Sequence, residues 1–417
     1  MAKTPLLCLL AIVALSAEAL PQQKGSLLDK RGQRATALSK ETRSTDPVTL
    51  PPAALFKVVK YSTPLGEMPA YLSQPHPDDD PDQAQPAIIW LTGGFPPCSP
   101  GDFLWTEADP ANDQSARVYR QYGIRMMFPF VRGTADVCPG RQELFYGEVN
   151  DVIDAYHFLS KDPSVDKERI YLGGHSTGGT LALLVAESTD LFAGILALGP
   201  TEDDYGEDNA IYEWNEIERS LRAPIKHLSS VQTRTYVIEG QGGNSDSLEA
   251  MRSANKNPVI QFTLIPNADH FELIHPVNEL FAQAILESED GTLDISNSAL
   301  EGSVLTYNVR MRETEDLHTL ADLREAGTDF SQPQRMSHYL SAESEAPLDE
   351  FRKAAKKRGF ELRDRGLRSD EGGVPFRLLT LDKTIRLTEL ESVFQCHQDA
   401  IDLAQAAEMQ HWFWSIE

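Results

Sequence analysis

The sequence predicts an α/β domain with a mainly parallel sheet, followed by a small α+β domain. Over residues 87–288, short apolar runs alternate with segments of helical periodicity, as in folds whose parallel strands are joined by helices. After a polar stretch at 289–300, strands and helices of a different order follow. At roughly 150 residues per domain, a chain of 417 residues has room for both.

The elements of the first domain follow from local patterns. A hairpin is expected over 56–73, where a Pro-Leu-Gly turn separates two alternating runs. Buried strands are then expected at 87–94, 124–133, 169–176, 193–200, 234–240 and 259–266. Helices are expected at 112–123, 143–163, 177–188, 247–256 and 276–288. Functional groups should therefore gather at the carboxyl ends of the strands.

The chain is expected to contain four segments, three of which lie before residue 291. Residues 1–19 have an apolar core and end in Ala-Glu-Ala, which is typical of a secretory signal peptide. A retained N-terminal membrane anchor is the alternative. Residues 20–45 are polar and aperiodic, so they are expected to form a flexible leader. The α/β domain is placed at 46–290, and the acidic, aromatic stretch 201–230 either covers a site or is an ordinary crossover.

The second domain is placed at 303–417. Strands are expected at 303–312, 335–343, 360–366, 375–383 and 411–417, and helices at 318–327, 348–359 and 387–408. This order suggests an antiparallel sheet in an accessory module.

Composition and charge exclude some classes of function. There are 63 acidic and 38 basic residues, which gives a net charge of −25. Such a surface repels phosphate backbones, so nucleic-acid binding is not expected. After the N-terminal segment, the sequence contains no run of about 20 apolar residues, the length that a membrane-spanning helix needs. We therefore expect a secreted or periplasmic protein.

The cysteines fit an oxidising compartment. Removal of a signal peptide containing Cys8 would leave Cys98, Cys138 and Cys396. Cys98 and Cys138 follow two expected strands, and a disulfide between them is a hypothesis. No segment has the spacing of zinc ligands, and no metal or organic cofactor is expected.

The strongest motif is Gly174-His175-Ser176-Thr177-Gly178, which joins an expected strand directly to an expected helix. This G-x-S-x-G pattern in that context is typical of a nucleophilic serine on a sharp turn. The amide of Thr177, at the helix start, is then suited to stabilise an oxyanion. Gly94 and Phe95, which follow the 87–94 strand, are candidates for the second oxyanion donor.

A base and an acid should follow Ser176 along the chain. His270 comes after the last expected strand and is preferred as base to His275, which borders the final helix. Asp246 is the choice for the acid because it is the only carboxylate in the loop after the 234–240 strand. It could instead cap the helix that follows, and Asp203 or Asp204 would then be the acid.

These segments resemble the α/β-hydrolase superfamily, and within it the prolyl oligopeptidase and dienelactone hydrolase-like group. The resemblance covers residues 50–288 and is carried by VRGTADVCPG, ELFYGEVNDVIDAYHFL, DPSVDKERIYLGGHSTGGTLALL, VIEG and NADHF. It implies the α/β-hydrolase fold, with Ser176 as nucleophile, His270 as base and Asp246 as acid. The amides of Thr177 and of Gly94 or Phe95 would form the oxyanion hole.

The C-terminal residues 303–417 resemble the ribonuclease E inhibitor family, the regulators of ribonuclease activity B. The resemblance is carried by LADLREAGTDFSQPQRMSHYLSAE, LDEFRKAAKKRGFEL and HWFWSIE. It implies a compact α+β module that binds proteins. An accessory or dimerising role is expected here rather than ribonuclease regulation, because a cytosolic partner does not fit an exported chain.

The leading hypothesis is a serine hydrolase that cleaves an ester or small amide through an acyl-enzyme on Ser176. One alternative is an exopeptidase acting on short peptides, with Glu143 and Glu148 near the expected cleft. The other is a catalytically silent hydrolase fold that binds a partner through the C-terminal module.

Overall fold

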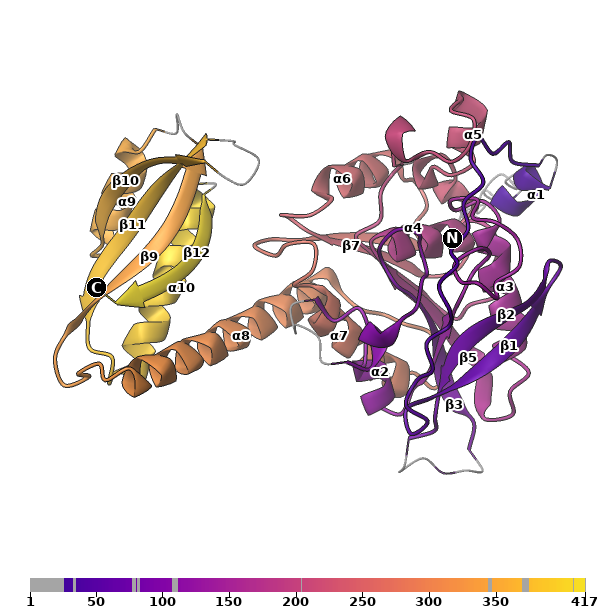
Figure 1. Ribbon diagram of the computed structural model, residues 1–417, viewed down its shortest axis with the longest axis horizontal. Helices are drawn as coiled ribbons and strands as arrows, with labels where there is room; N and C mark the ends of the chain where they lie inside the picture. Colours follow the sequence, from indigo (N-terminus) through magenta and orange to yellow (C-terminus); the bar gives the residue numbers. More distant parts are fainter. Residues whose placement is uncertain are drawn as a thin grey trace, which may run out of the picture.

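A computed structural model gives the fold of the chain (Figure 1). The structure describes residues 26–32, 35–76, 80, 83–106, 112–203, 205–343, 347–369, 375–407 and 409–416. The expected signal peptide lies outside these residues. No helix in the described ranges is long and apolar enough to cross a membrane.

The first domain contains a twisted, mostly parallel sheet of eight strands. The strands are β1 (Phe56–Thr63), β2 (Gly66–Ser73), β3 (Gln85–Leu91), β4 (Arg125–Pro129), β5 (Val165–His175), β6 (Ile195–Leu198), β7 (Thr235–Gly240) and β8 (Ile260–Ile265). Their order is β1-β2-β4-β3-β5-β6-β7-β8, in which β2 pairs antiparallel with β1 and β4. The other pairs are parallel. This confirms the predicted fold class.

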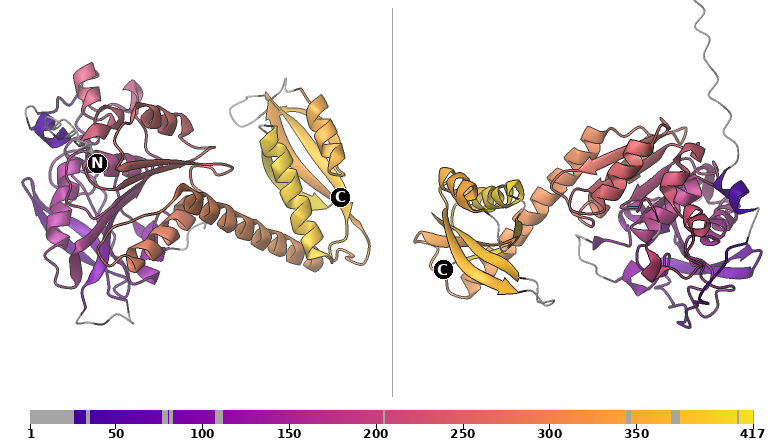
Figure 2. Two further views of the ribbon diagram at one scale, coloured as in Figure 1. Left: turned by 180° about the vertical axis from the view of Figure 1, so that it is seen from behind. Right: turned by 90° about the horizontal axis from the view of Figure 1, so that it is seen from above.

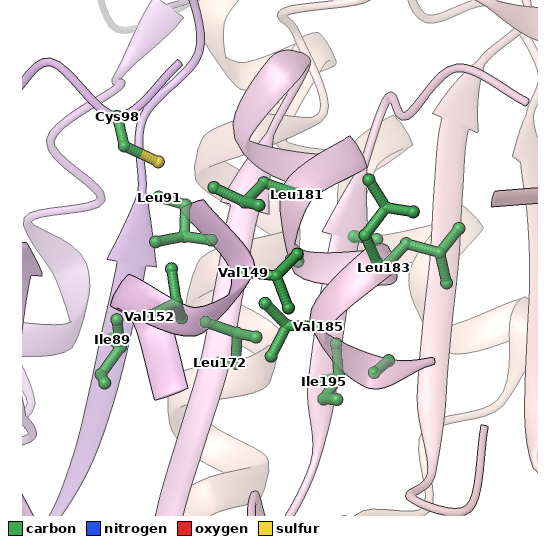
Figure 3. Packing of buried hydrophobic residues seen from close by; sticks show 14 of the residues in the cluster. Ile89, Leu91, Cys98, Val149, Val152, Leu172, Leu181, Leu183, Val185 and Ile195 are labelled. Carbon is green, nitrogen blue, oxygen red and sulfur yellow. The ribbon is translucent and has the colours of Figure 1, made fainter. Parts of the chain in front are cut away.

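Helices cover both faces of this sheet. They are α1 (Leu27–Arg31), α2 (Val118–Gln121), α3 (Glu148–Leu159), α4 (Thr177–Ala186), α5 (Glu216–Ser220), α6 (Ser245–Ala254) and α7 (Ile274–Glu287). In Figure 3, Val149 and Val152 of α3 and Val185 of α4 pack near Leu172 of β5. A second buried cluster, which includes residues of α2 and α7, lies apart from this one. Burial of apolar side chains in both clusters is the main stabilising term.

The N-terminal leader is packed on the domain in the part that the structure describes, contrary to expectation. Leu27 is fully buried in the α3/α4 cluster, and its N–H donates to the carbonyl of Glu187 at 3.1 Å. The guanidinium of Arg31 is also buried and donates to the carbonyl oxygens of Leu221 and Tyr146. The polar composition of residues 20–45 gives no indication that Leu27 and Arg31 are buried against the domain.

The first domain also continues beyond residue 290. Leu293, Ile295, Leu300 and Val304 are buried in the second core cluster. The last two lie on α8 (Asn297–Glu325), one continuous helix of 29 residues. The strand predicted at 303–312 is therefore wrong: Leu300, Val304 and Asn308 recur every four residues and form a helical face.

The C-terminal module is an antiparallel sheet with helices. Its elements are β9 (Gln334–Glu343), α9 (Asp349–Lys357), β10 (Glu361–Ser369), β11 (Pro375–Ile385), α10 (Leu390–Ala406) and β12 (Gln410–Ile416). The strand order is β10-β11-β9-β12, and the helices lie on one face of the sheet (Figure 2). Helix α8 runs from the first domain to this module (Figure 1). Apart from α8, the α+β prediction for this module is confirmed.

Candidate active site

Ser176 occupies a sharp turn between β5 and α4. Its backbone angles are φ 56° and ψ −119°, a strained conformation for a residue with a side chain. The turn is held by the N–H of Ser176, which donates to the carbonyl of Leu198 at 2.8 Å. A Cβ atom at Gly178 would overlap the carbonyl oxygen of Leu91, so only glycine fits there. The local geometry is that of the turn expected from the G-x-S-x-G pattern.

His270 lies in the loop between β8 and α7, beside the end of β6. Gly199 follows Leu198 at the end of β6, and a Cβ atom there would be 2.8 Å from Nδ1 of His270. Ser176 and His270 therefore both contact the Leu198–Gly199 segment. This segment brings together two residues that are far apart in the sequence.

The carboxylate beside His270 belongs to Glu239. Nδ1 of His270 lies 2.9 Å from Oε2 of Glu239, whose side chain is 1% exposed. The backbone N–H groups of Gly240 and Asn244 donate to the same carboxylate at 2.7 and 2.8 Å. These two hydrogen bonds hold the carboxylate in place beside His270. With the hydrogen of His270 on Nδ1, its lone pair is on Nε2.

The structure therefore does not place the predicted acid beside the histidine. Asp246 is exposed in the first turn of α6, and the N-cap of this helix is Asn244, so Asp246 does not cap it either. Asp203 forms an ion pair with Arg219 at 3.3 Å, and Asp204 lies outside the described residues. Glu239 lies within β7 itself, so a search for the acid in the loop after this strand does not find it. A lone carboxylate in the buried run of β7 was the available signal.

His275 also lies apart from this arrangement. Its Nδ1 is 3.8 Å from Oδ2 of Asp113, and its ring stacks on Tyr307. The structure thus places His270 beside Glu239, and His275 near Asp113.

A second histidine, His175, supports the loop that carries His270. Nε2 of His175 donates to the carbonyl oxygen of His270 at 2.8 Å, and Nδ1 accepts from Nε2 of Gln114 at 2.8 Å. Burial and the neighbouring His270 lower the pKa of His175 to about 3, so this imidazole is neutral at neutral pH. Sequence reasoning gave His175 no role, although it lies within the motif.

The three candidate oxyanion donors come from two segments that are in contact. The hydroxyl of Thr177 donates to the carbonyl of Gly94 at 2.6 Å, which ties the loop after β3 to the start of α4. Gly94 has φ +101°, a conformation that favours glycine. The N–H groups of Gly94, Phe95 and Thr177 donate to no described protein group.

An aromatic wall stands next to this loop. The ring of Phe95 is 54% exposed and meets Tyr205 edge to face at 4.9 Å. Tyr205 also stacks on Phe145 at 5.5 Å, and its hydroxyl lies 3.0 Å from Oγ1 of Thr180. Tyr205 belongs to the stretch 201–230, so part of this stretch does lie beside the candidate site.

Glu143 and Glu148 belong to a buried charge network. Arg132 forms ion pairs with Asp151 at 2.8 Å and with Glu143 at 3.0 Å. Oε1 of Glu148 accepts the N–H of Glu143 at 2.6 Å, and burial raises the pKa of Glu148. Glu143 is therefore paired, whereas the buried Oε2 of Glu148 has no hydrogen-bond partner among the described groups.

The expected disulfide is not formed. Cys98, Cys138 and Cys396 are free and buried. Cys98 packs in the cluster that contains α3 and α4, whereas Cys138 packs in the other core cluster. The cysteine side chains therefore belong to separate cores.

Two family models match the chain. The prolyl oligopeptidase family (Peptidase_S9) matches residues 138–242, a segment that contains Ser176 and Glu239. The family of regulators of ribonuclease activity B matches residues 313–410. No curated protein sequence matches the chain.

Several solved structures align with part of the chain. A puromycin hydrolase aligns at 18% identity and TM-score 0.45, covering 60% of this chain and 42% of its own. A puromycin-hydrolyzing peptidase of Mycobacterium tuberculosis has 19% identity and TM-score 0.43, covering 62% and 41%. An esterase of Pyrococcus furiosus has 14% identity and TM-score 0.42, covering 59% and 95%. The chain thus spans about two fifths of the puromycin-hydrolysing relatives.

The family matches and the sheet topology agree with the resemblance seen in the sequence. The chain has a segment that matches the prolyl oligopeptidase family (Peptidase_S9) within an α/β-hydrolase fold, followed by a segment that matches the regulators of ribonuclease activity B.

Proposed function

We propose that this protein is a serine hydrolase in which Ser176 is the nucleophile, His270 the general base and Glu239 the acid. The observation that carries the proposal is the pair of His270 and the buried Glu239, 2.9 Å apart, beside the strained turn of Ser176. A serine hydroxyl is a weak nucleophile until an oriented base accepts its proton. Glu239 supplies the orientation because it fixes the hydrogen on Nδ1 of His270.

The reaction proceeds through an acyl-enzyme. Oγ of Ser176 attacks the substrate carbonyl carbon while Nε2 of His270 takes the hydroxyl proton. The N–H of Thr177 and that of Gly94 or Phe95 stabilise the oxyanion. His270 then donates its proton to the leaving alcohol or amine. Water then attacks the acyl carbon and gives a proton to His270. His270 passes this proton to Oγ of Ser176 as the carboxylic acid leaves.

The substrate class is an ester or small amide with an apolar group next to the scissile bond. The exposed ring of Phe95 and the adjoining Tyr205 support this choice, since they present an apolar wall beside the oxyanion loop. Cleavage of short peptides is the second candidate, favoured by the Peptidase_S9 match. Glu143 is already paired with Arg132, so it is not a free anchor for a peptide amine. Oε1 of Glu148 accepts a backbone N–H, and its buried Oε2 has no hydrogen-bond partner among the described groups.

Labelling with a fluorophosphonate probe tests the proposal directly. We expect one adduct, located at Ser176 by mass spectrometry, and loss of labelling in Ser176→Ala and His270→Ala. The exposed Ser253 provides a control, and Ser253→Ala should label as wild type. An unlabelled but folded wild-type protein would overturn the proposal and favour a silent hydrolase fold that binds a partner.

A substrate panel separates the two candidate classes. Nitrophenyl esters of graded acyl length and aminoacyl nitroanilides should be compared on the same preparation. We expect the esters to be preferred by kcat/KM and the preference to weaken in Phe95→Ala. Faster cleavage of aminoacyl amides than of every ester would favour the peptidase.

A further inference from the structure

Three histidines converge in the C-terminal module, away from the candidate active site. His338 is on β9, His397 on α10 and His411 on β12. One nitrogen atom of each lies within 4.8 Å of the other two. His338 is fully buried and His397 is 8% exposed, so these side chains are held in place by packing.

The contacts of His338 and His411 indicate which of their nitrogen atoms face each other. Nδ1 of His338 faces Nε2 of His411 at 3.2 Å. Nε2 of His338 lies 3.6 Å from Sγ of Cys396, a contact in which the ring can donate its hydrogen to sulfur. This tautomer leaves Nδ1 of His338 as an acceptor. Neighbouring nitrogen ligands of a tetrahedral zinc, with Zn–N of about 2.0–2.1 Å, are roughly 3.3 Å apart. The distance between His338 and His411 fits that value.

Asp316 on α8 orients the third histidine. Its Oδ1 lies 2.7 Å from Nδ1 of His397 and accepts the indole N–H of Trp414, also at 2.7 Å. Because Nδ1 of His397 donates to this carboxylate, Nε2 carries the free lone pair. A carboxylate behind a metal-binding imidazole is the common outer-shell arrangement in zinc sites.

The surroundings favour a cation. Two of the three histidines, His397 and His411, line a cavity of about 470 Å³. The carboxylates of Glu272, Glu315 and Asp316 line it too, against the single guanidinium of Arg312.

We propose that His338, His397 and His411 bind one zinc ion, with Asp316 as the outer-shell partner of His397. The three protein ligands leave a fourth position for water. Imidazole nitrogens select zinc and similar transition metals over magnesium and calcium, which prefer oxygen ligands. The site is independent of the Ser176 chemistry and needs no step of the proposed hydrolysis.

Zinc titration of the chain tests the proposal. The protein is purified without a histidine tag, stripped with a chelator and titrated with zinc sulfate against a chromophoric zinc indicator. We expect one zinc per chain, and a visible absorption band typical of tetrahedral coordination when cobalt(II) replaces zinc. Magnesium and calcium at the same concentrations should not displace the metal.

Three variants separate this site from adventitious binding. His411→Gln should abolish stoichiometric zinc binding, and Asp316→Asn should weaken zinc affinity by about 10–100-fold. His318 is exposed on the same helix as Asp316, so His318→Gln should bind zinc as wild type does. Circular dichroism and Ser176 labelling report folding of each variant independently of the metal.

Three results would overturn the proposal. They are no stoichiometric zinc binding by the folded wild type, undiminished zinc binding by His411→Gln, or a loss of zinc binding in His318→Gln equal to that in His411→Gln. If His411→Gln does not fold, the cobalt spectrum of the wild type and the zinc affinity of Asp316→Asn still test the proposal.

Discussion

Nδ1 of His270 lies 2.9 Å from Oε2 of Glu239, at the end of β7. Glu239→Gln retains the size of the side chain but removes the charge that fixes the hydrogen on Nδ1. If the proposed triad operates, kcat should fall by about 10³–10⁴-fold, the magnitude known for the corresponding loss in a serine protease. Steady-state kinetics on the best ester of the panel measure this change.

Asp246 provides the matched control for Glu239. It is exposed on α6, so Asp246→Asn should leave kcat within a factor of about two, as for a surface substitution. A large loss of kcat in Asp246→Asn, together with near-normal kcat in Glu239→Gln, would identify Asp246 as the acid instead.

The pH dependence of stability should report the neutral His175. Its pKa in the folded protein is about 3, below the ordinary value of 6.5, because it is buried. The unfolded chain therefore binds the extra proton first as pH falls below about 6.5. From there down to about pH 3, this residue should reduce the free energy of unfolding by up to about 1.4 kcal/mol per pH unit.

Urea unfolding at a series of pH values measures this slope. His175→Gln should make the slope shallower by up to one proton equivalent over that interval. The exposed His157 is the control, and His157→Gln should retain the wild-type slope. Equal slopes in wild type and His175→Gln would show that His175 is not the titrating group.

The buried pair of Arg132 and Asp151 should be a major contributor to stability. Asp151 is fully buried and accepts from Nε and from the backbone N–H of Arg132, both at 2.9 Å. Asp151→Ala would leave the guanidinium buried without this partner, so unfolding should become easier by about 3–5 kcal/mol. Chemical denaturation measures the loss.

An exposed pair gives the comparison for Asp151→Ala. Lys60 and Glu67 are 3.4 Å apart and largely exposed on the β1–β2 hairpin. Glu67→Gln should change the free energy of unfolding by less than about 1 kcal/mol. Similar losses at both sites would argue against a special contribution from the buried pair.

The sequence was most informative where the chain is locally periodic. Alternating apolar strands and helices predicted the mainly parallel sheet, and the glycines around Ser176 predicted its turn. The acid could not be found in this way, because the choice depends on which carboxylate the 240–244 loop wraps around. Only the folded chain shows that the N–H groups of this loop enclose Glu239.

The histidine cluster illustrates the same limit. His338, His397 and His411 are spread over 74 residues of sequence, without the short spacings by which metal sites are recognised. They meet because β9 and β12 are paired and α10 packs on the same sheet. Contacts set by sheet pairing leave no local trace in a single sequence.

The state of the cysteines can be checked without any substitution. Cys98 and Cys138 are free and lie in separate core clusters, and burial raises the pKa of both thiols. Since the thiolate is the reactive form, both should resist iodoacetamide in the folded protein. In denaturant without a reductant, both should be alkylated completely, as peptide mass spectrometry would show. A peptide pair joined through Cys98 and Cys138 would contradict the structure and restore the disulfide suggested by the sequence.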